Sequence, residues 1–185
     1  MKSLAVLAVL ASPALADPLD GAPPEQAPAH REAGFLGGGV AVGGGHLMHA
    51  AWALEGALAI PGTPLFVRAA AQRGGAFDFE GTGSFWRAAG GIEARACNGM
   101  DGYCWIAGLD VGYQHETWNS GDPGDITEVH QGLVVGPRGG IDAGGEHVRF
   151  RATIEYLEYH HESNVGMTGW ETAAGLSLGL AYRLD

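Results

Sequence analysis

The chain has 185 residues, 32 of them glycine, and a formal net charge of −11 at pH 7. A strongly acidic chain lacks the basic footprint that nucleic-acid binding needs, so this class of function is disfavoured. After residue 16 there is no run of about eighteen or more apolar residues, which excludes a helical membrane protein.

Residues 1–16 are typical of a cleaved secretory signal. Lys2 supplies a charged start, Leu4–Leu10 is an apolar run too short to span a bilayer, and Ala14 and Ala16 form a small-residue cleavage site. The segment that follows is rich in Pro and charge and has no periodicity, which is typical of a flexible leader. The predicted organisation is a signal peptide at 1–16, a periplasmic leader at 17–33 and one domain at 34–185.

From Gly34 onward, segments of alternating polarity are separated by clusters of Gly, Pro, Asn and Asp. A period of two predicts β-strands. We expect eight strands, at 34–44, 49–60, 64–74, 84–97, 104–116, 127–142, 147–160 and 169–184. The connections near 75–83, 117–126 and 161–168 are predicted to be longer and more polar than those between them, so the three longer ones would share the outer end of an up-and-down barrel.

The last segment shows the alternation most clearly. Its even positions carry Trp170 and a run of leucines that ends at Leu184, whereas its odd positions carry Glu171, small residues and Arg183. An oily face opposite a small or charged face fits a strand with lipid outside and a crowded polar lumen inside. A soluble carrier barrel, the alternative, would have the oily face inside. The sequence therefore predicts an all-β fold, an eight-stranded antiparallel up-and-down transmembrane β-barrel.

The aromatic residues of these segments are expected to form two belts at the membrane interfaces. The predicted outer belt consists of Trp52, Trp86, Tyr113, Tyr156 and Trp170, and the predicted inner belt of Phe35, Trp105, Phe150 and Tyr182.

The same alternation predicts which charged side chains point into the lumen. They are Glu55, Arg68, Arg87, Glu93, Arg95, Asp110, Arg138, Asp142, Arg149, Arg151, Glu155, Glu171 and Arg183. These seven arginines and six carboxylates nearly balance, and buried charges are tolerated only when they are paired. Eight strands enclose only enough room for side chains. We therefore expect a packed salt-bridge network, with a structural or surface-binding role, rather than an open pore.

Cys97 and Cys104 flank a short turn. In an exported chain such a pair indicates a disulfide that staples a hairpin, and two thiols supply only half of a tetrahedral metal shell.

Several histidines fall near the expected outer end: His46, His49, His115, His130, His160 and His161. Carboxylates of the same region join them. Such a rim could hold a divalent cation, or its charge could change between about pH 7 and 5. The other interpretation is a set of solvated loop residues, because no metal-binding spacing occurs. We therefore predict no cofactor.

The end of the seventh segment reads Tyr159-His160-His161-Glu162-Ser163-Asn164. On an extended strand His161 and Ser163 share a face, so the imidazole could activate the hydroxyl, and Glu171 could orient the imidazole. This H-x-S-N pattern resembles the outer-membrane lipid A deacylases. The resemblance implies a serine esterase acting on lipopolysaccharide acyl chains, with His161 as base, Ser163 as nucleophile and Glu171 as orienting residue.

An acyl substrate would require these side chains to face the lipid. The alternation instead places them on the lumen side, unless a β-bulge near Tyr156–Leu157 switches the face. The esterase is therefore the second hypothesis.

The barrel as a whole resembles the small eight-stranded outer-membrane proteins of Gram-negative bacteria. That resemblance implies a location in the cell outer membrane. It also implies outer-membrane lipid, lipopolysaccharide and the barrel assembly machinery as partners.

Overall fold

The computed structural model describes residues 33–184, except residues 46, 79, 99–101, 120, 122–123 and 125 and the side chain of Asn98. The predicted signal peptide at 1–16 and the leader up to residue 32 lie outside the described residues, as does His46. Within the described ranges we find no helix long and apolar enough to cross a membrane.

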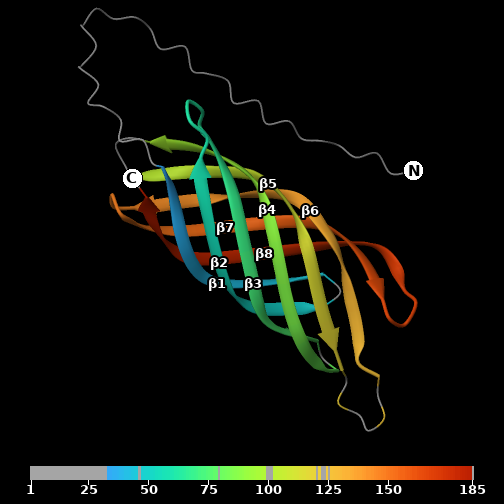
Figure 1. The fold of residues 1–185 in the computed structure, drawn as a ribbon. Helices are drawn as coiled ribbons and strands as arrows, with labels where there is room; N and C mark the ends of the chain where they lie inside the picture. The colour runs from blue at the N-terminus through green and yellow to red at the C-terminus, as the bar shows by residue number, and fades with distance from the viewer. Residues whose placement is uncertain are drawn as a thin grey trace, which may run out of the picture. The chain divides into compact units, whose positions relative to one another are not determined.

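Residues 34–184 form eight strands joined in sequence order (Figure 1). They are β1 (Gly34–Gly44), β2 (Met48–Ala59), β3 (Leu65–Phe77), β4 (Thr82–Asn98), β5 (Tyr103–Trp118), β6 (Glu128–Gly144), β7 (Val148–Ser163) and β8 (Thr168–Leu184). Each strand pairs antiparallel with its sequence neighbours, and β1 pairs with β8 from Gly34↔Leu184 to Gly44↔Ala174. The barrel is therefore closed and has no free sheet edge, which confirms the predicted fold.

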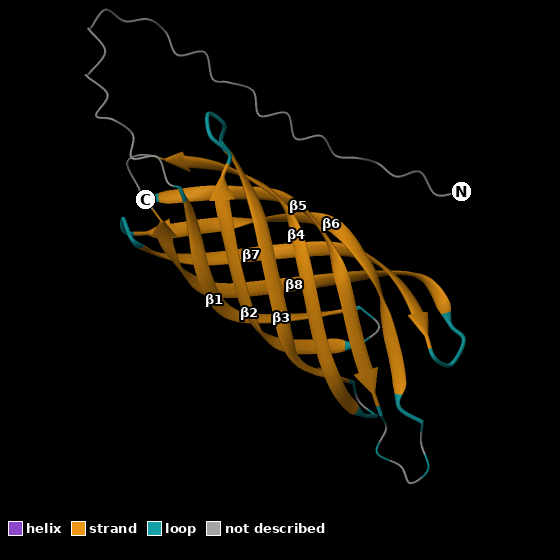
Figure 2. Ribbon diagram, in the orientation of Figure 1, coloured by secondary structure: helices purple, strands orange, loops and turns teal. Residues whose placement is uncertain are grey.

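The antiparallel order puts alternate connections at opposite ends of the barrel (Figure 2). We call the end with the β2–β3, β4–β5 and β6–β7 turns the inner end. The end with the β1–β2, β3–β4, β5–β6 and β7–β8 connections is called the outer end.

The strands extend further at the outer end than the sequence pattern indicated. The residues between β3 and β4 are 78–81, and those between β7 and β8 are 164–167, so the predicted long connections near 75–83 and 161–168 are wrong. Hairpin pairing continues through polar residues there, because ladder hydrogen bonds do not require an apolar face. The β5–β6 connection, residues 119–127, is long as predicted.

The two faces of the wall differ in polarity. Outward side chains are large and apolar, with exposed fractions of 75% for Trp52, 67% for Leu54 and 65% for Ile154. Inward side chains include Glu93 at 0% and Arg151 at 2%. This distribution of polarity is the reverse of that in a soluble protein, and the barrel is stable only where hydrocarbon surrounds its wall. The soluble carrier alternative is therefore wrong.

The outer aromatic belt lies on the lipid side as predicted, with all five of its residues exposed on the outer face of the wall. The inner belt is wrong at one position. Phe35 is 3% exposed and packs inside the barrel against Ala57, Phe66 and Ala181. Its ring lies beneath two guanidinium groups, so the lumen provides a better environment for it than the membrane interface does.

Small residues on the inner face make room for the charged ones. A Cβ atom built on Gly91 would lie 2.3 Å from Asp110 Oδ1, and one built on Gly175 would lie 2.8 Å from Glu155 Oε1. Both distances are too short for real atoms, so these carboxylates occupy space that only glycine leaves free.

Candidate functional site

The lumen is crossed by a continuous set of ion pairs centred on Glu93 of β4. Its carboxylate accepts hydrogen bonds from Arg95 Nε at 2.6 Å, from Arg138 Nη2 at 2.7 Å and from Arg151 Nη2 at 3.2 and 3.0 Å. These arginines come from β4, β6 and β7, so one buried carboxylate holds three strands together. Arginine suits this position because its planar group donates in several directions at once.

Further ion pairs extend this set to β2, β3 and β5. Asp110 accepts from Arg68 at 2.9 Å and from Arg138 at 3.1 Å, and Glu55 lies 3.0 Å from Arg68 and 2.9 Å from Arg151. Arg138 contacts two carboxylates and Arg151 contacts three, since it also lies 3.3 Å from Asp142, which makes one connected network.

Two cavities lined by Arg68 have volumes of about 20 and 10 Å³. A larger hollow of about 710 Å³, lined by Phe66, Arg95 and Cys97, lies at the inner end.

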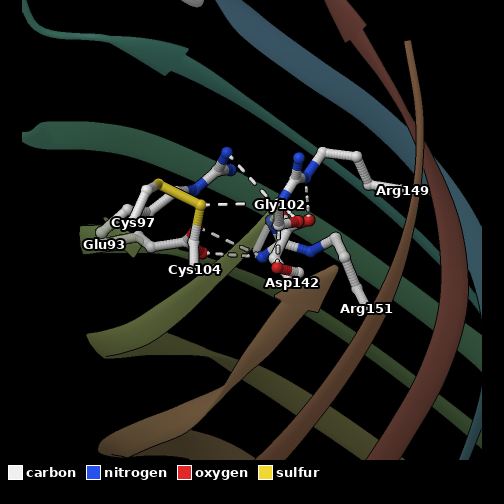
Figure 3. Close-up of a disulfide and its surroundings, with 8 residues drawn as sticks. Glu93, Cys97, Gly102, Cys104, Asp142, Arg149 and Arg151 are labelled. Atoms are coloured by element: carbon white, nitrogen blue, oxygen red, sulfur yellow. Dashed lines mark hydrogen bonds and ion pairs between the residues drawn. A yellow bond between two sulfur atoms is a disulfide. The ribbon is translucent and has the colours of Figure 1, made fainter. Parts of the chain in front are cut away.

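At the inner end the network meets the predicted disulfide, which the structure contains between Cys97 and Cys104 (Figure 3). Arg149 Nη2 lies 3.6 Å from Cys104 Sγ and donates to the carbonyl oxygens of Gly102 at 2.8 Å and Asp142 at 2.9 Å. Arg149 Nε also pairs with the Asp142 carboxylate. The arginine therefore ties the stapled turn to the end of β6.

Two phenylalanine rings cover the same end of the lumen. The guanidinium carbon of Arg95 lies 4.5 Å from the Phe35 ring centre and 4.2 Å from that of Phe66, and the guanidinium carbon of Arg151 lies 4.0 Å from Phe35. Cation–π contacts of this kind stabilise arginine in a dry environment.

Arg87 begins a second chain of contacts, toward the outer end. It pairs with Glu155 and donates from Nε at 2.8 Å and from Nη2 at 2.6 Å to Gln114 Oε1. Gln114 Nε2 in turn donates to Glu116 Oε1 at 2.8 Å. The amide thus links the arginine to a carboxylate that is only 3% exposed.

The structure places all thirteen residues of the predicted lumen set at lumen-facing positions. Glu55, Glu171 and Arg183 are half-buried, and the other ten are buried. Sequence reasoning did not include Phe66 or Gln72. The period of two could have found Phe66, since it alternates with Arg68, but the Ala- and Gly-rich third segment gave too weak a pattern.

The histidines of the outer end are divided by the barrel wall. His49, His130 and His161 are buried in the lumen, where His49 stacks on Phe85 with ring centres 4.1 Å apart. His115 and His160 occupy outward positions beside Trp86 and Trp170. Among the residues that the structure describes, no group of three or more His, Cys, Asp or Glu side chains is arranged to hold a metal ion.

Two of the three residues in the esterase hypothesis lie together. His161 Nδ1 is 3.8 Å from Glu171 Oε1, whereas Ser163 Oγ accepts a hydrogen bond from Val165 N at 3.1 Å. Burial alternates without interruption from Arg149 to His161. There is therefore no bulge near Tyr156–Leu157, and His161 faces the lumen rather than the lipid.

The closed wall, the apolar outer face and the charged lumen define an eight-stranded β-barrel of the outer-membrane class, located in the cell outer membrane.

Solved structures of that class are similar to this chain. Neisserial surface protein A matches with a TM-score of 0.63 and 10% identity, over 82% of this chain and 96% of that chain. Ail, the attachment invasion locus protein of Yersinia pestis, matches with a TM-score of 0.56 and 13% identity, over 83% and 100%. The N-terminal barrel domain of Pseudomonas aeruginosa OprF matches with a TM-score of 0.52 and 11% identity, over 83% and 98%.

No family model and no curated protein matches the sequence. The structural similarity concerns the fold alone, and the comparisons do not show the local resemblance to lipid A deacylases.

Proposed function

We propose that the protein is a structural or surface-binding component of the outer membrane whose lumen is closed to solute flow. The observation that carries this proposal is the network around Glu93, in which arginines of β3, β6 and β7 meet carboxylates of β2, β4 and β5. A pore would need a continuous aqueous path. Cavities of about 20 and 10 Å³ are each comparable to the space for one water molecule.

The outer connections support a role in surface contacts. Asn164 Oδ1 accepts from Val129 N at 2.9 Å and its Nδ2 donates to the Thr127 carbonyl oxygen at 2.9 Å, which ties the β7–β8 turn to the end of the β5–β6 connection. Next to this tie, Ile126 is 70% exposed and Val165 is 45% exposed. Apolar side chains held in place outside the strands are suited to contact another surface.

The proposed partners are membrane lipid, lipopolysaccharide and the barrel assembly machinery. Membrane lipid covers the apolar belt, lipopolysaccharide surrounds its outer half, and the barrel assembly machinery inserts the chain. One structure of Ail from Yersinia pestis is a complex with the heparin analogue sucrose octasulfate. That ligand does not transfer to this chain, because the described outer connections carry Asp78 and Glu80, which repel a polyanion.

Planar-bilayer recording of the refolded protein tests the closed lumen. We expect no large steady conductance from the wild-type protein. The OprF barrel domain, reconstituted in parallel, serves as a control for insertion. Folded insertion of this chain is verified separately in lipid vesicles, by its protection from protease. A stable nanosiemens conductance from protein shown to be inserted would overturn the proposal.

The esterase is the second candidate, and the observation in its favour is the 3.8 Å separation of His161 Nδ1 and Glu171 Oε1. A buried imidazole beside a carboxylate matches the orienting half of a triad. Its lumen-facing position does not favour an acyl substrate. Incubation of the refolded protein with lipid A, followed by mass spectrometry, tests this candidate, and the absence of deacylated product would remove it.

A further inference from the structure

The outer half of the lumen contains a cluster of acidic and histidine side chains that the closed-lumen proposal does not use. We define the outer lumen cluster as Glu116, Glu128, His130, His161 and Glu171. His130 Nε2 lies 3.3 Å from Glu128 Oε2, and the rings of His130 and His161 are 5.4 Å apart in an edge-to-face arrangement. His161 Nδ1 lies 3.8 Å from Glu171 Oε1. The two imidazoles therefore lie in a row between two carboxylates.

The third carboxylate approaches the same row from β5. Glu116 lies directly opposite His130 across the β5–β6 ladder, and both side chains are buried, at 3% and 2% exposed. Gly132 and Gly169 are the ladder partners of His161, so no side chain separates the imidazole from its neighbours on these strands. Five titratable groups from β5, β6, β7 and β8 thus share one part of the lumen.

A buried hydroxyl in the same place lacks a hydrogen-bond partner among the described residues. Tyr159 is 3% exposed, its ring lies 5.6 Å from that of His161, and it lies directly opposite Glu171 on β8. A buried hydroxyl without a partner is costly, and a proton held on a nearby carboxylate or a bound water would satisfy it.

Among the described residues, the cation beside the cluster is shared with another carboxylate. Arg87 of β4 is the neighbouring cation, and it already pairs with Glu155 of β7. The other elements contribute the uncharged amides of Gln72 (β3) and Gln114 (β5), and His49 (β2), which stacks on Phe85. The lumen-facing positions of β1 carry Phe, Gly and Ala. With neutral imidazoles, three carboxylates in a low-dielectric site would repel one another.

We propose that the outer lumen cluster is a proton-binding site that takes up protons when the barrel folds and when the pH falls below neutrality. Each added proton, on an imidazole or on a carboxylate, reduces the repulsion between Glu116, Glu128 and Glu171. In the unfolded chain the same carboxylates are solvated and far apart. The cluster therefore binds more protons in the folded state, and its own contribution to stability rises as the pH falls from 7.5 to 5.5. His49, which is buried against Phe85, resists protonation in the folded state and contributes in the opposite sense.

The pH dependence of unfolding tests this proposal. The folding equilibrium constant of the refolded protein in detergent micelles is measured by denaturant titration between pH 7.5 and 5.5. One extra bound proton corresponds to about a tenfold increase per pH unit of acidification. The Glu116→Gln/Glu171→Gln double variant is expected to lose most of this dependence, since it removes two of the three carboxylates while keeping their shape.

The matched control is Glu158→Gln/Glu162→Gln, which removes two carboxylates from outward positions of β7 near the same end. This control is expected to keep the wild-type pH dependence. His49 is present in the wild-type protein and in both variants, so the test compares the slopes of stability against pH. A slope in the Glu116/Glu171 double variant equal to that of the wild-type protein would overturn the proposal.

A second measurement uses only the wild-type protein, in case the double variant fails to fold. Imidazole NMR resonances of His130 and His161 are followed against pH, with His147 in the exposed β6–β7 turn as reference. Coupled sites titrate in broad or biphasic curves. Simple single-site curves for both residues, with the midpoint of His147, would contradict the proposal.

Discussion

Arg151 of β7 reaches Glu93 of β4 inside the lumen and donates to both of its carboxylate oxygens, at 3.2 and 3.0 Å. The two residues are 58 positions apart in sequence, and their strands are not neighbours in the barrel. Because Glu93 also accepts from Arg95 and Arg138, its single charge compensates parts of three guanidinium groups. The stability of the barrel should therefore depend strongly on this carboxylate.

Replacing Glu93 by Gln should destabilise the barrel by about 3–5 kcal/mol, because buried guanidinium groups lose their counter-charge while the side-chain shape is kept. Denaturant unfolding in micelles, followed by tryptophan fluorescence, measures the change. Glu146→Gln in the exposed β6–β7 turn is the matched control and should leave the stability unchanged. Equal stabilities of the two variants would show that the network does not act as described.

Removal of the disulfide by a Cys97→Ser/Cys104→Ser double substitution should cost about 2–3 kcal/mol in the chain-entropy account of so short a loop. The barrel should still form, because the β4–β5 ladder continues well beyond the cysteines. Unfolding of the double variant is compared with that of wild-type protein in reductant, and the two should agree. A wild-type midpoint that reductant leaves unchanged, although mass analysis confirms reduction, would contradict the prediction.

A methyl group at position 91 should be poorly tolerated. In Gly91→Ala the new Cβ would lie 2.2 Å from the Leu109 carbonyl oxygen and 2.3 Å from Asp110 Oδ1, so the β4–β5 wall must shift, at a cost of about 1–3 kcal/mol. Gly90→Ala is the control, since its Cβ would point outward with its nearest neighbour at 3.5 Å. The loss of stability should be confined to position 91, and a similar loss at both positions would refute the steric explanation.

A tryptophan on the outer face of the wall should contact lipid, whereas a tryptophan on the inner face should not. Trp52 is 75% exposed on the outer face, whereas Trp118 packs with Leu47 and Phe85 and donates to Asp78 Oδ1 at 3.1 Å. In single-tryptophan variants reconstituted into vesicles, brominated acyl chains should quench Trp52 several-fold more strongly than Trp118. Equal quenching would mean that the outer face of β2 is not the lipid-facing one.

Ser163→Ala decides the esterase hypothesis if the wild-type protein deacylates lipid A at all. The closed-lumen proposal predicts no activity in either protein. His161 faces the lumen, and Ser163 Oγ accepts a hydrogen bond from Val165 N instead of contacting the imidazole. Wild-type activity that disappears in Ser163→Ala, with the fold intact by gel mobility, would instead establish the esterase.

The sequence by itself determined the number of strands and which side of the wall most residues occupy. Both depend on a period of two that is local to each strand, and the alternation of Arg149 and Arg151 with Phe150 and Ala152 is visible without any partner. The disulfide could be predicted in the same way, because Cys97 and Cys104 are close in sequence and lie directly opposite each other in one hairpin.

Only the tertiary structure decided which charges meet. Glu93 and Arg151 become partners because the barrel closes with a fixed register, which no single strand encodes. Closure also brought the ring of Phe35 beneath Arg95 and Arg151, and it brought the rings of His130 and His161 to within 5.4 Å of each other. The physical reason is the same in each case. Contacts across the lumen depend on the curvature and stagger of the whole sheet, whereas alternation within a strand depends only on the pleat of its own backbone.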